Sequence, residues 1–312
     1  MSEQWAFLFP GQGSQKTGMG AALAAEFPAA RRVFQAADEA LGEPLSELCF
    51  HGPEEELALT ANTQPAILVC SIAAWTVVGE ELGLVPTVCL GHSLGEFSAL
   101  VAAGALDFAD AVRLVRLRGL AMQEAVPAGI GAMAAVVGLE AEPLGILCAE
   151  ASDTQAQVTI ANENGGGQIV VAGHAQAVHR LIAAAKAVRA RAILLNVSAP
   201  FHCSLMSPAA ERVAAALERI TIHPLRVPVI ANVDAAQNLD PTRVKDLLVR
   251  QITGRVRWEA SVRNAVHMSV TRCLELGHGK VLAGLIKRIA PTLPVVPVGS
   301  PEDVHVLKVD AS

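Results

Sequence analysis

The pentapeptide Gly91-His92-Ser93-Leu94-Gly95 follows a short apolar run and precedes a stretch of helix-forming residues. A Gly-x-Ser-x-Gly pattern between a strand and a helix is typical of a nucleophile elbow, a sharp turn at which bulky flanking side chains would collide with nearby backbone. The turn exposes the serine oxygen at a helix N-terminus, where unpaired amides and the helix dipole can stabilise an oxyanion. The sequence therefore predicts that Ser93 is a nucleophile.

A base for this serine is expected where two domains meet. His202, one of nine histidines, stands in the proline-bent segment 198–203, which we interpret as the connection between a small and a large domain. Binding clefts are common between domains, and histidine titrates near neutral pH. His202 is therefore the candidate base, with a merely exposed loop histidine as the alternative.

Three arginines, Arg113, Arg116 and Arg118, lie on the predicted helix 107–124, for which Asp107 is a plausible N-cap. Arginines at this spacing are usually solvated or paired with nearby carboxylates. Their spacing alone does not indicate which of them, if any, contacts a substrate.

Two glycine-rich segments have both a functional and a structural interpretation. Segment 10–15 lacks the Lys-Ser/Thr ending and the spacing of a phosphate-binding loop, so it is either a loop whose amides approach a ligand or an ordinary turn. Segment 162–167 lies between two predicted strands, where a simple turn is favoured over a ligand-facing role.

The order of the predicted elements changes near Pro127. Before that residue and again after residue 198, strands alternate with helices, which implies a parallel sheet covered on both faces. The part between them has the order βαββαβ of the ferredoxin-like arrangement. We therefore predict an α/β fold with a large domain of residues 1–127 and 198–312 and an inserted small domain of residues 128–197. The predicted strands are 5–9, 87–90, 132–137, 158–161, 168–172, 192–197, 227–231 and 270–276. The predicted helices are 21–41, broken or bent near Pro28, 65–82, 94–103, 107–124, 141–152, 175–188, 208–219, 241–252, 258–267 and 280–289.

The composition is that of a globular protein. The 312 residues are 52% hydrophobic and 17% charged, which suffices for a large core without disulfides. Six scattered cysteines and a polar N-terminus predict a reducing, cytoplasmic setting. The longest uncharged apolar run, 65–79, is shorter than the roughly 20 residues of a spanning helix, so we expect a buried helix and no membrane segment. A net charge of −6 argues against nucleic acid as a substrate.

Six segments, in order, make the chain resemble the malonyl-CoA:acyl-carrier-protein transacylases of bacterial fatty acid synthesis over nearly its whole length. The resemblance implies a hydrolase-like α/β domain with a ferredoxin-like small domain, in agreement with the element order. The segments are Phe9-Pro-Gly-Gln-Gly-Ser-Gln15, Gly91-His-Ser-Leu-Gly-Glu96, Leu117-Arg-Gly-Leu-Ala-Met122, Gln168-Ile-Val-Val-Ala-Gly173, Ala199-Pro-Phe-His202 and Val249-Arg-Gln251.

The resemblance also implies a role for individual residues. Ser93 would be the acylated nucleophile, His202 its general base and then acid, and Arg118 the partner of the free malonyl carboxylate. A planar guanidinium binds a carboxylate through two hydrogen bonds, and a serine needs an adjacent base to attack a thioester. The further implied residues are Gln12 and Leu94 as oxyanion donors through their backbone amides, Gln251 as the backbone carbonyl that orients His202, and His92, Met122 and Asn162 as pocket-lining residues.

Two positions, Phe201 and His278, depart from the bacterial pattern, and a third, Leu94, bears on which acyl group is selected. Phe201 stands where serine is common and resembles the phenylalanine of malonyl-selecting polyketide acyltransferase domains, so it is expected to narrow the pocket. Leu94 stands where methylmalonyl-type domains have glutamine, which points the same way. His278 stands where a proline is usual.

The partners that the resemblance implies are malonyl-CoA, CoA and acyl carrier protein, and we expect a monomer that needs no metal and no cofactor. Because carrier proteins are acidic as a family, an acidic enzyme should concentrate positive charge where they dock. The candidate docking residues are Lys186, Arg189, Arg191, Lys287 and Arg288, although such charge runs are usually solvated faces.

Other functions remain open on the sequence. A serine esterase or thioesterase would share the elbow and the base, but Arg118 and a water-poor cleft argue against hydrolysis. A subunit that only holds carrier protein would not need both Ser93 and His202. A related role in polyketide assembly or malonate decarboxylation would use the same chemistry, and the sequence does not separate it from fatty acid synthesis.

Overall fold

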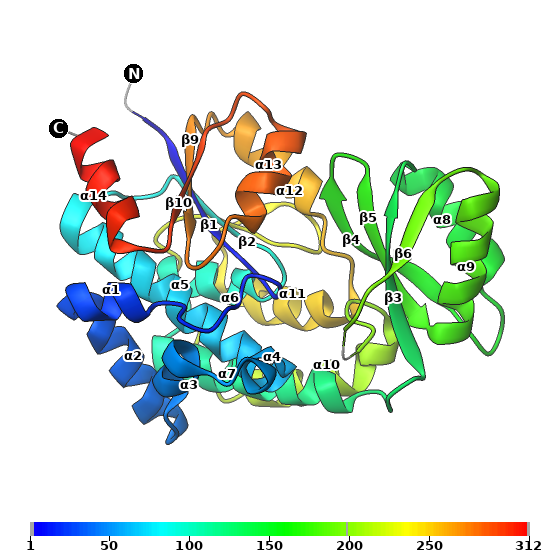
Figure 1. Cartoon of the computed structure of the whole chain (residues 1–312), viewed down its shortest axis with the longest axis horizontal. Coiled ribbons are helices and arrows are strands. Elements are labelled where there is room, and N and C mark those ends of the chain that lie inside the picture. Colours follow the sequence, from blue (N-terminus) through cyan, green and yellow to red (C-terminus); the bar gives the residue numbers. More distant parts are fainter. Residues whose placement is uncertain (1–2, 198, 311–312) are drawn as a thin grey trace.

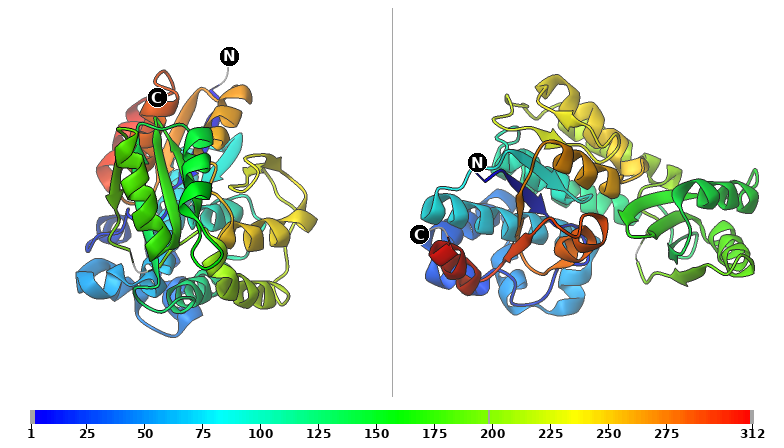
Figure 2. Two further views of the ribbon diagram at one scale, coloured as in Figure 1. Left: turned by 90° about the vertical axis from the view of Figure 1, so that its right-hand side faces the viewer. Right: turned by 90° about the horizontal axis from the view of Figure 1, so that it is seen from above.

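The computed structural model describes residues 3–197 and 199–310. Over these residues the chain forms two sheets, one of six strands and one of four, in two parts that lie side by side (Figure 1). The larger sheet is flanked by helices on both faces, and the smaller sheet carries its two helices on the side away from the larger part (Figures 1 and 2). The predicted α/β fold with a ferredoxin-like second part is confirmed.

The larger sheet has the strand order β10-β9-β1-β2-β7-β8. All neighbouring strands are parallel except β7 and β8, which are antiparallel. The sheet therefore differs at this one edge from the wholly parallel sheet that was predicted. Central strand β1 buries both faces: Phe7 and Phe9 pack in one hydrophobic cluster, and Ala6 and Leu8 in another. The strands are β1 Trp5–Phe9, β2 Val88–Gly91, β7 Val229–Ile230, β8 Gln237–Asn238, β9 Arg272–Leu276 and β10 Val295–Val298.

The helices of the larger part follow the predicted pattern, with several additional short elements. Short helices α3 and α4, the turn η1, the last helix α14 and strands β8 and β10 were not predicted. The predicted break near Pro28 is present, since α1 and α2 meet at Phe27. The helices are α1 Ala21–Glu26, α2 Pro28–Leu41, α3 Leu45–His51, α4 Glu54–Ala58, α5 Thr60–Leu82, α6 Gly95–Ala102, α7 Phe108–Glu124, the 3-10 turn η1 Ser204–Met206, α10 Ser207–Leu217, α11 Pro241–Thr253, α12 Trp258–His267, α13 Val281–Ile289 and α14 Pro301–Asp310.

Helix α5 begins five residues earlier than predicted, because Pro65 lies inside the helix and not at its start. Proline has no N–H to donate to the carbonyl four residues before it. That carbonyl, of Ala61, instead accepts a hydrogen bond from Arg116 Nη1 at 2.9 Å. The tertiary contact therefore compensates for the bond that Pro65 removes.

Helix α5 is also long and apolar enough to cross a membrane by length and composition, unlike the shorter run recognised in the sequence. In the structure, 67% of its most apolar window is buried inside the protein. The helix packs against α2, α6 and α7. It is therefore a core helix, as expected, but because of its burial and not because of its length.

The smaller sheet has the order β4-β5-β3-β6, with every neighbouring pair antiparallel, which is the ferredoxin-like topology. The predicted turn 162–167 is shorter than expected, because β4 continues to Gly165. Positive φ angles at Gly165, Gly166 and Gly167 allow the tight reversal into β5. The elements are β3 Gly131–Val137, α8 Ala141–Ala151, β4 Val158–Gly165, β5 Gln168–His174, α9 Ala175–Ala187 and β6 Arg191–Leu194.

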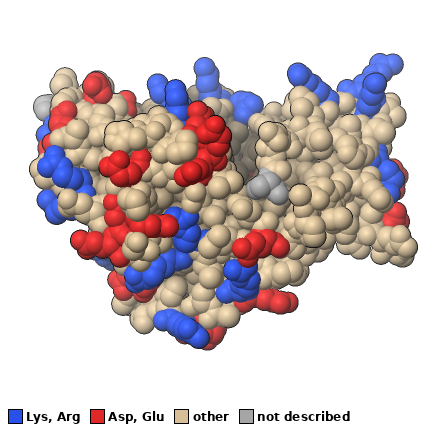
Figure 3. Space-filling model, turned by 60° about the horizontal axis from the view of Figure 1, so that its bottom comes forward, with Lys and Arg blue, Asp and Glu red and all other residues tan. Residues whose placement is uncertain are grey.

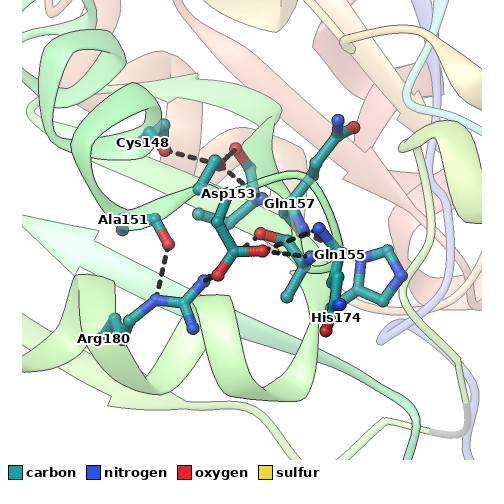
Figure 4. Close-up of polar contacts among 10 residues, drawn as sticks. Cys148, Ala151, Asp153, Gln155, Gln157, His174 and Arg180 are labelled. Atoms are coloured by element: carbon teal, nitrogen blue, oxygen red, sulfur yellow. Dashed lines mark hydrogen bonds and ion pairs between the residues drawn. The ribbon is translucent and has the colours of Figure 1, made fainter.

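The loop between α8 and β4 is held by Asp153, whose carboxylate accepts hydrogen bonds from the backbone amides of Gln155 and Ala156 (Figure 4). These bonds, and then Arg180 of α9 at 2.8 Å, hold the pKa of Asp153 below its usual value. Arg180 also donates to the carbonyl of Ala151. The loop is thereby tied to both helices of the smaller part.

Candidate active site

Ser93 lies at a sharp turn between β2 and α6, and it has a positive φ of 51°. A Cβ at Gly91 would lie 1.9 Å from the backbone of Gly95, and a Cβ at Gly95 would lie 1.9 Å from the carbonyl oxygen of Phe9. Neither position therefore accepts a side chain. The steric demand that the sequence pattern implied is present in the structure.

The Oγ of Ser93 lies 2.7 Å from Nε2 of His202. The other ring nitrogen, Nδ1, lies 2.8 Å from the backbone carbonyl oxygen of Gln251. Because a carbonyl only accepts, Nδ1 carries the proton, and Nε2 is free to accept the proton of Ser93. The structure thus brings together the predicted nucleophile, base and orienting carbonyl.

His202 is 3% exposed and also has a positive φ, of 61°. Burial, and then the nearby Arg118 charge, lower the pKa of His202 to about 3. The imidazole is therefore neutral throughout the neutral pH range, as a base requires.

Arg118 extends from α7 into the space beside Ser93 and is 0% exposed. Its Nη2 lies 3.2 Å from Ser93 Oγ and 3.0 Å from Gln251 Oε1, and its Nη1 lies 2.8 Å from Gln64 Oε1. Burial lowers the pKa of Arg118 to about 10, so the side chain stays charged at neutral pH. These three direct hydrogen-bond partners are uncharged, which leaves the buried guanidinium suited to an incoming anion.

The backbone amides of Gln12 and Leu94 have no hydrogen-bond partner among the described residues. Leu94 is the N-cap of α6, where amides are left free by helix geometry. The loop of Gln12 packs directly on the elbow, since a Cβ at Gly11 would lie 2.4 Å from the carbonyl oxygen of His92. Both amides are thus available beside the elbow, as an oxyanion site requires.

Ser93 and His202 open into a cavity of about 420 Å³ between the two parts of the molecule. His92, Asn162 and Phe201 line it, as predicted, together with Gln12. Met122 is not among the lining residues: it is 1% exposed, and its sulfur lies 3.6 Å from Nε2 of Gln64. Arg118 is equally buried and also lies outside this lining, so burial alone does not decide the role of Met122, which stays a prediction.

A second cavity, of about 440 Å³, adjoins the first and shares Gln12, His92 and Asn164 with it. Nε2 of His92 lies 2.9 Å from Asn164 Oδ1, and this contact joins the elbow to β4 of the smaller part. His92 also packs edge-on against Trp258. His92 therefore lies at the junction of the two cavities.

Sequence reasoning did not identify several polar residues around the pair, namely Gln64, Glu96, Asn164, Asn232 and the side chain of Gln251. Asn232 Oδ1 accepts the backbone N–H of Ser93 at 2.7 Å, and its Nδ2 donates to Gly91 O at 2.7 Å. The position of Asn232 directly after strand β7 could have identified it from the sequence, because ligand sites of α/β folds form at the carboxyl ends of parallel strands. Gln64, in the middle of a long apolar helix, gave no comparable signal.

Asp107 and His278 lie away from Ser93. Asp107 stands at the N-cap of α7 but makes no capping bond; its carboxylate instead lies 3.3 Å from His223. His278 lies between β9 and α13, and nothing in the structure explains a histidine there in place of proline. Ser198, with which the large domain was expected to resume, lies outside the described residues.

A serine bonded to a histidine at an elbow of an α/β fold is typical of enzymes that form acyl–serine intermediates. The acyl transferase domain family matches residues 6–290, and the chain belongs to that family. Within it, the chain is similar to proteins that are named malonyl CoA-acyl carrier protein transacylase. The relative from Escherichia coli strain K12 is 48% identical over 299 residues, 96% of each chain, and that from Bacillus subtilis strain 168 is 48% identical over 301 residues, 96% of this chain and 95% of the other.

Solved structures agree. An acyl-carrier-protein S-malonyltransferase from Bartonella henselae superposes with a TM-score of 0.95 at 45% identity over 99% of both chains. A malonyl-transacylase in complex with a type II polyketide synthase acyl carrier protein superposes with the same score at 44% identity, over 99% of this chain and 100% of the other. The resemblance seen in the sequence motifs is confirmed.

Proposed function

We propose that this protein is a malonyl-CoA:acyl-carrier-protein S-malonyltransferase of fatty acid synthesis. The observation that carries the proposal is Arg118, a fully buried cation 3.2 Å from the oxygen of Ser93 and bonded only to uncharged groups. A malonyl thioester places a free carboxylate two carbons from the reacting carbonyl. Arg118 is therefore suited to hold that carboxylate while Ser93 attacks.

The geometry supports a two-step transfer. Ser93 Oγ attacks the thioester carbonyl as His202 Nε2 takes its proton, and the carbonyl oxygen becomes an oxyanion beside the amides of Gln12 and Leu94. Collapse of the intermediate breaks the C–S bond, and His202 returns the proton to the departing CoA sulfur. The thiol of the carrier protein then attacks the malonyl–serine ester by the same steps in reverse order.

A serine esterase or thioesterase would use the same pair but would pass the acyl group to water. Arg118 argues against this alternative, because a buried guanidinium would have no partner on an uncharged acyl chain. The decisive experiment offers the protein malonyl-CoA with a carrier protein that bears phosphopantetheine, and measures the mass of the carrier. We expect a malonyl-carrier product, whereas a carrier without the prosthetic group should stay unmodified; release of free malonate alone would support hydrolysis instead.

The carrier protein is expected to dock on the five cations predicted from the sequence. All five are exposed, and none of them forms an ion pair with a carboxylate within the described part of the chain. Figure 3 shows Lys and Arg side chains along one rim of the molecule, on both sides of the hollow between its two parts. Arg288 also lines the cavity beside His92 and donates to Gln168 across the two parts. Exposed cations without a carboxylate partner would attract an acidic carrier.

Reversal of Lys186, Arg189 and Arg191 to glutamate is expected to weaken transfer to the carrier protein by about tenfold or more at low salt, because screening is weakest there. Acylation by malonyl-CoA alone should remain intact. The measurement compares both half-reactions at two ionic strengths. Arg219→Glu, at an exposed cation beyond the end of α10, is the matched control. An equal loss in both half-reactions would indicate misfolding and would count against the docking site.

The proposal also includes the domain boundaries, the location in the cell and the oligomeric state. The domain boundaries at 127/128 and 197/198 are supported by the start of β3 at Gly131 and the end of β6 at Leu194. A cytoplasmic location is supported by the six cysteines, which are all buried and free. We further propose that the enzyme acts as a monomer without metal or cofactor.

A further inference from the structure

Glu96 is a buried carboxylate that the transfer mechanism does not use. It lies in the first turn of α6, three residues after the nucleophile, and is 2% exposed. Its Oε2 accepts hydrogen bonds from Gln251 Nε2 at 2.8 Å and from the backbone N–H of Asn232 at 3.0 Å. A buried carboxylate that is hydrogen-bonded but has no direct cation partner needs a reason, because burial of a charge is costly.

The two residues bonded to Glu96 are the same ones that hold Ser93. Gln251 Nε2 donates to the carbonyl oxygen of Ser93 at 2.8 Å, and Asn232 Oδ1 accepts the N–H of Ser93 at 2.7 Å. The backbone carbonyl of Gln251 orients His202. Glu96 therefore lies behind both the nucleophile and the base.

The side-chain amide of Gln251 also lies between two opposite charges. Its oxygen accepts from Arg118 Nη2 at 3.0 Å, and its nitrogen donates to Glu96. A flip of this amide would place its oxygen against the carboxylate and its NH₂ group against the guanidinium. The charges of Arg118 and Glu96 thus fix one orientation of Gln251, and they interact electrostatically through it.

We propose that Glu96 is the buried counter-ion of Arg118, and that its charge sets how strongly Arg118 holds the free carboxylate of an acyl substrate. The inference rests on the proposed function and makes Glu96 a positioning residue that also contributes to substrate selection. In the free enzyme the two charges balance each other through Gln251. A malonyl carboxylate brings a second negative charge to one cation, and a charged Glu96 opposes its binding, whereas a neutral Glu96 does not.

Burial and four neighbouring groups set the pKa of Glu96. Burial raises the pKa of Glu96 to about 7, against the hydrogen bonds from Gln251 and Asn232; Asp234 raises it and Arg118 lowers it. Asp234, between β7 and β8, is paired with Arg243 of α11 at 3.0 Å. The neighbouring strands β1, β2 and β7 carry no charged residue, and the charged residues of α5, Glu80 and Glu81, pair with Arg32 and Lys308 at its far end. His202 contacts the backbone carbonyl of Gln251 and is not among the groups that shift the pKa of Glu96.

The sign of the effect follows from linkage. A substrate carboxylate beside Arg118 raises the pKa of Glu96 further, so binding of malonyl is coupled to uptake of a proton by Glu96. Malonyl binding is therefore favoured as the pH falls through the range in which Glu96 gains its proton. An acetyl group has no charge and is insensitive to this titration.

The test measures kcat/KM for malonyl-CoA and for acetyl-CoA in the acylation half-reaction, between about pH 6 and about pH 9. Division of the two values cancels the titration of His202 and of the thiol, which both substrates share. We expect the malonyl-to-acetyl ratio of the wild type to fall by about tenfold as the pH rises, since one further unit of pKa shift corresponds to a tenfold change. The glutamine of Glu96→Gln can accept the same hydrogen bonds without a charge. This variant should therefore show, at every pH tested, the malonyl-to-acetyl ratio that the wild type has at low pH.

Glu275→Gln is the matched control. Glu275 is also buried with a raised pKa, but it accepts amides at the N-terminus of α13 and does not contact the pair. This variant should keep the wild-type fall of the ratio with pH. A second readout is proton uptake during formation of the malonyl-enzyme, which the wild type should show and which acetylation should not.

Three outcomes would overturn the inference. In the wild type, the malonyl-to-acetyl ratio of kcat/KM could prove independent of pH. In Glu96→Gln, the ratio could still fall with pH as in the wild type, or kcat/KM could fall equally for both substrates. If Glu96→Gln does not fold, the wild-type ratio and proton uptake still decide. A wild type that transfers no malonyl at any pH would instead overturn the proposed function, and the two failures are thus distinguishable.

Discussion

Incubation of the wild-type protein with malonyl-CoA alone is expected to add one malonyl group to Ser93, and Ser93→Ala is expected to add none. The serine oxygen lies 2.7 Å from a neutral, correctly oriented imidazole, and the covalent ester must form before a carrier thiol can collect the acyl group. Intact-protein mass spectrometry measures the label, and peptide mapping locates it. The loss should be complete, because the mutation removes the atom that forms the bond.

Ser98→Ala provides a control on α6, the helix that follows the elbow. Ser98 is buried in α6, and its hydroxyl has no hydrogen-bond partner among the described residues, so its removal should leave labelling unchanged. If Ser93→Ala were labelled as fully as the wild type, the nucleophile would have to be another residue.

Arg118→Ala is expected to lower kcat/KM for malonyl-CoA by about two to three orders of magnitude and to change that for acetyl-CoA little. Loss of one partner from a desolvated charge pair costs roughly 3 to 5 kcal/mol, whereas an acetyl group offers no carboxylate to lose. Arg118→Lys should restore only part of the malonyl activity, because an ammonium cannot form two parallel hydrogen bonds with a carboxylate. The measurement compares both substrates at the same ionic strength.

Arg113→Ala is the matched control for this experiment. Arg113 lies on the same helix but is exposed and pairs with Asp110 one turn before it, so its removal should alter neither activity. An equal fall for malonyl-CoA and acetyl-CoA in Arg118→Ala would mean that Arg118 serves the structure of the site and not the recognition of the carboxylate.

The sequence determined the parts of this protein that depend on local constraints. The elbow is one of them, since Gly91 and Gly95 leave no space for a Cβ and only one short pattern satisfies this turn. The alternation of strands and helices, and the change to βαββαβ between them, fixed the two-part architecture. Prolines obscured two elements: strand β10 contains Pro297 and lies at the sheet edge, and α5 continues through Pro65.

Only the tertiary structure decided which polar side chains meet at Ser93. Arg113, Arg116 and Arg118 look alike in sequence, but a helix turns by about 100° per residue, and only Arg118 points to the core beside Phe97 and Ser93. Met122 follows on the same helix, yet its sulfur contacts Gln64 of α5 and it is not among the residues that line the cavity. Gln251, Asn232 and Glu96 come together from α11, the end of β7 and α6, and no local pattern links them. Their network exists because the packing of distant elements brings two buried ionisable groups, Arg118 and Glu96, to the same amide of Gln251, which spacing along the chain does not encode.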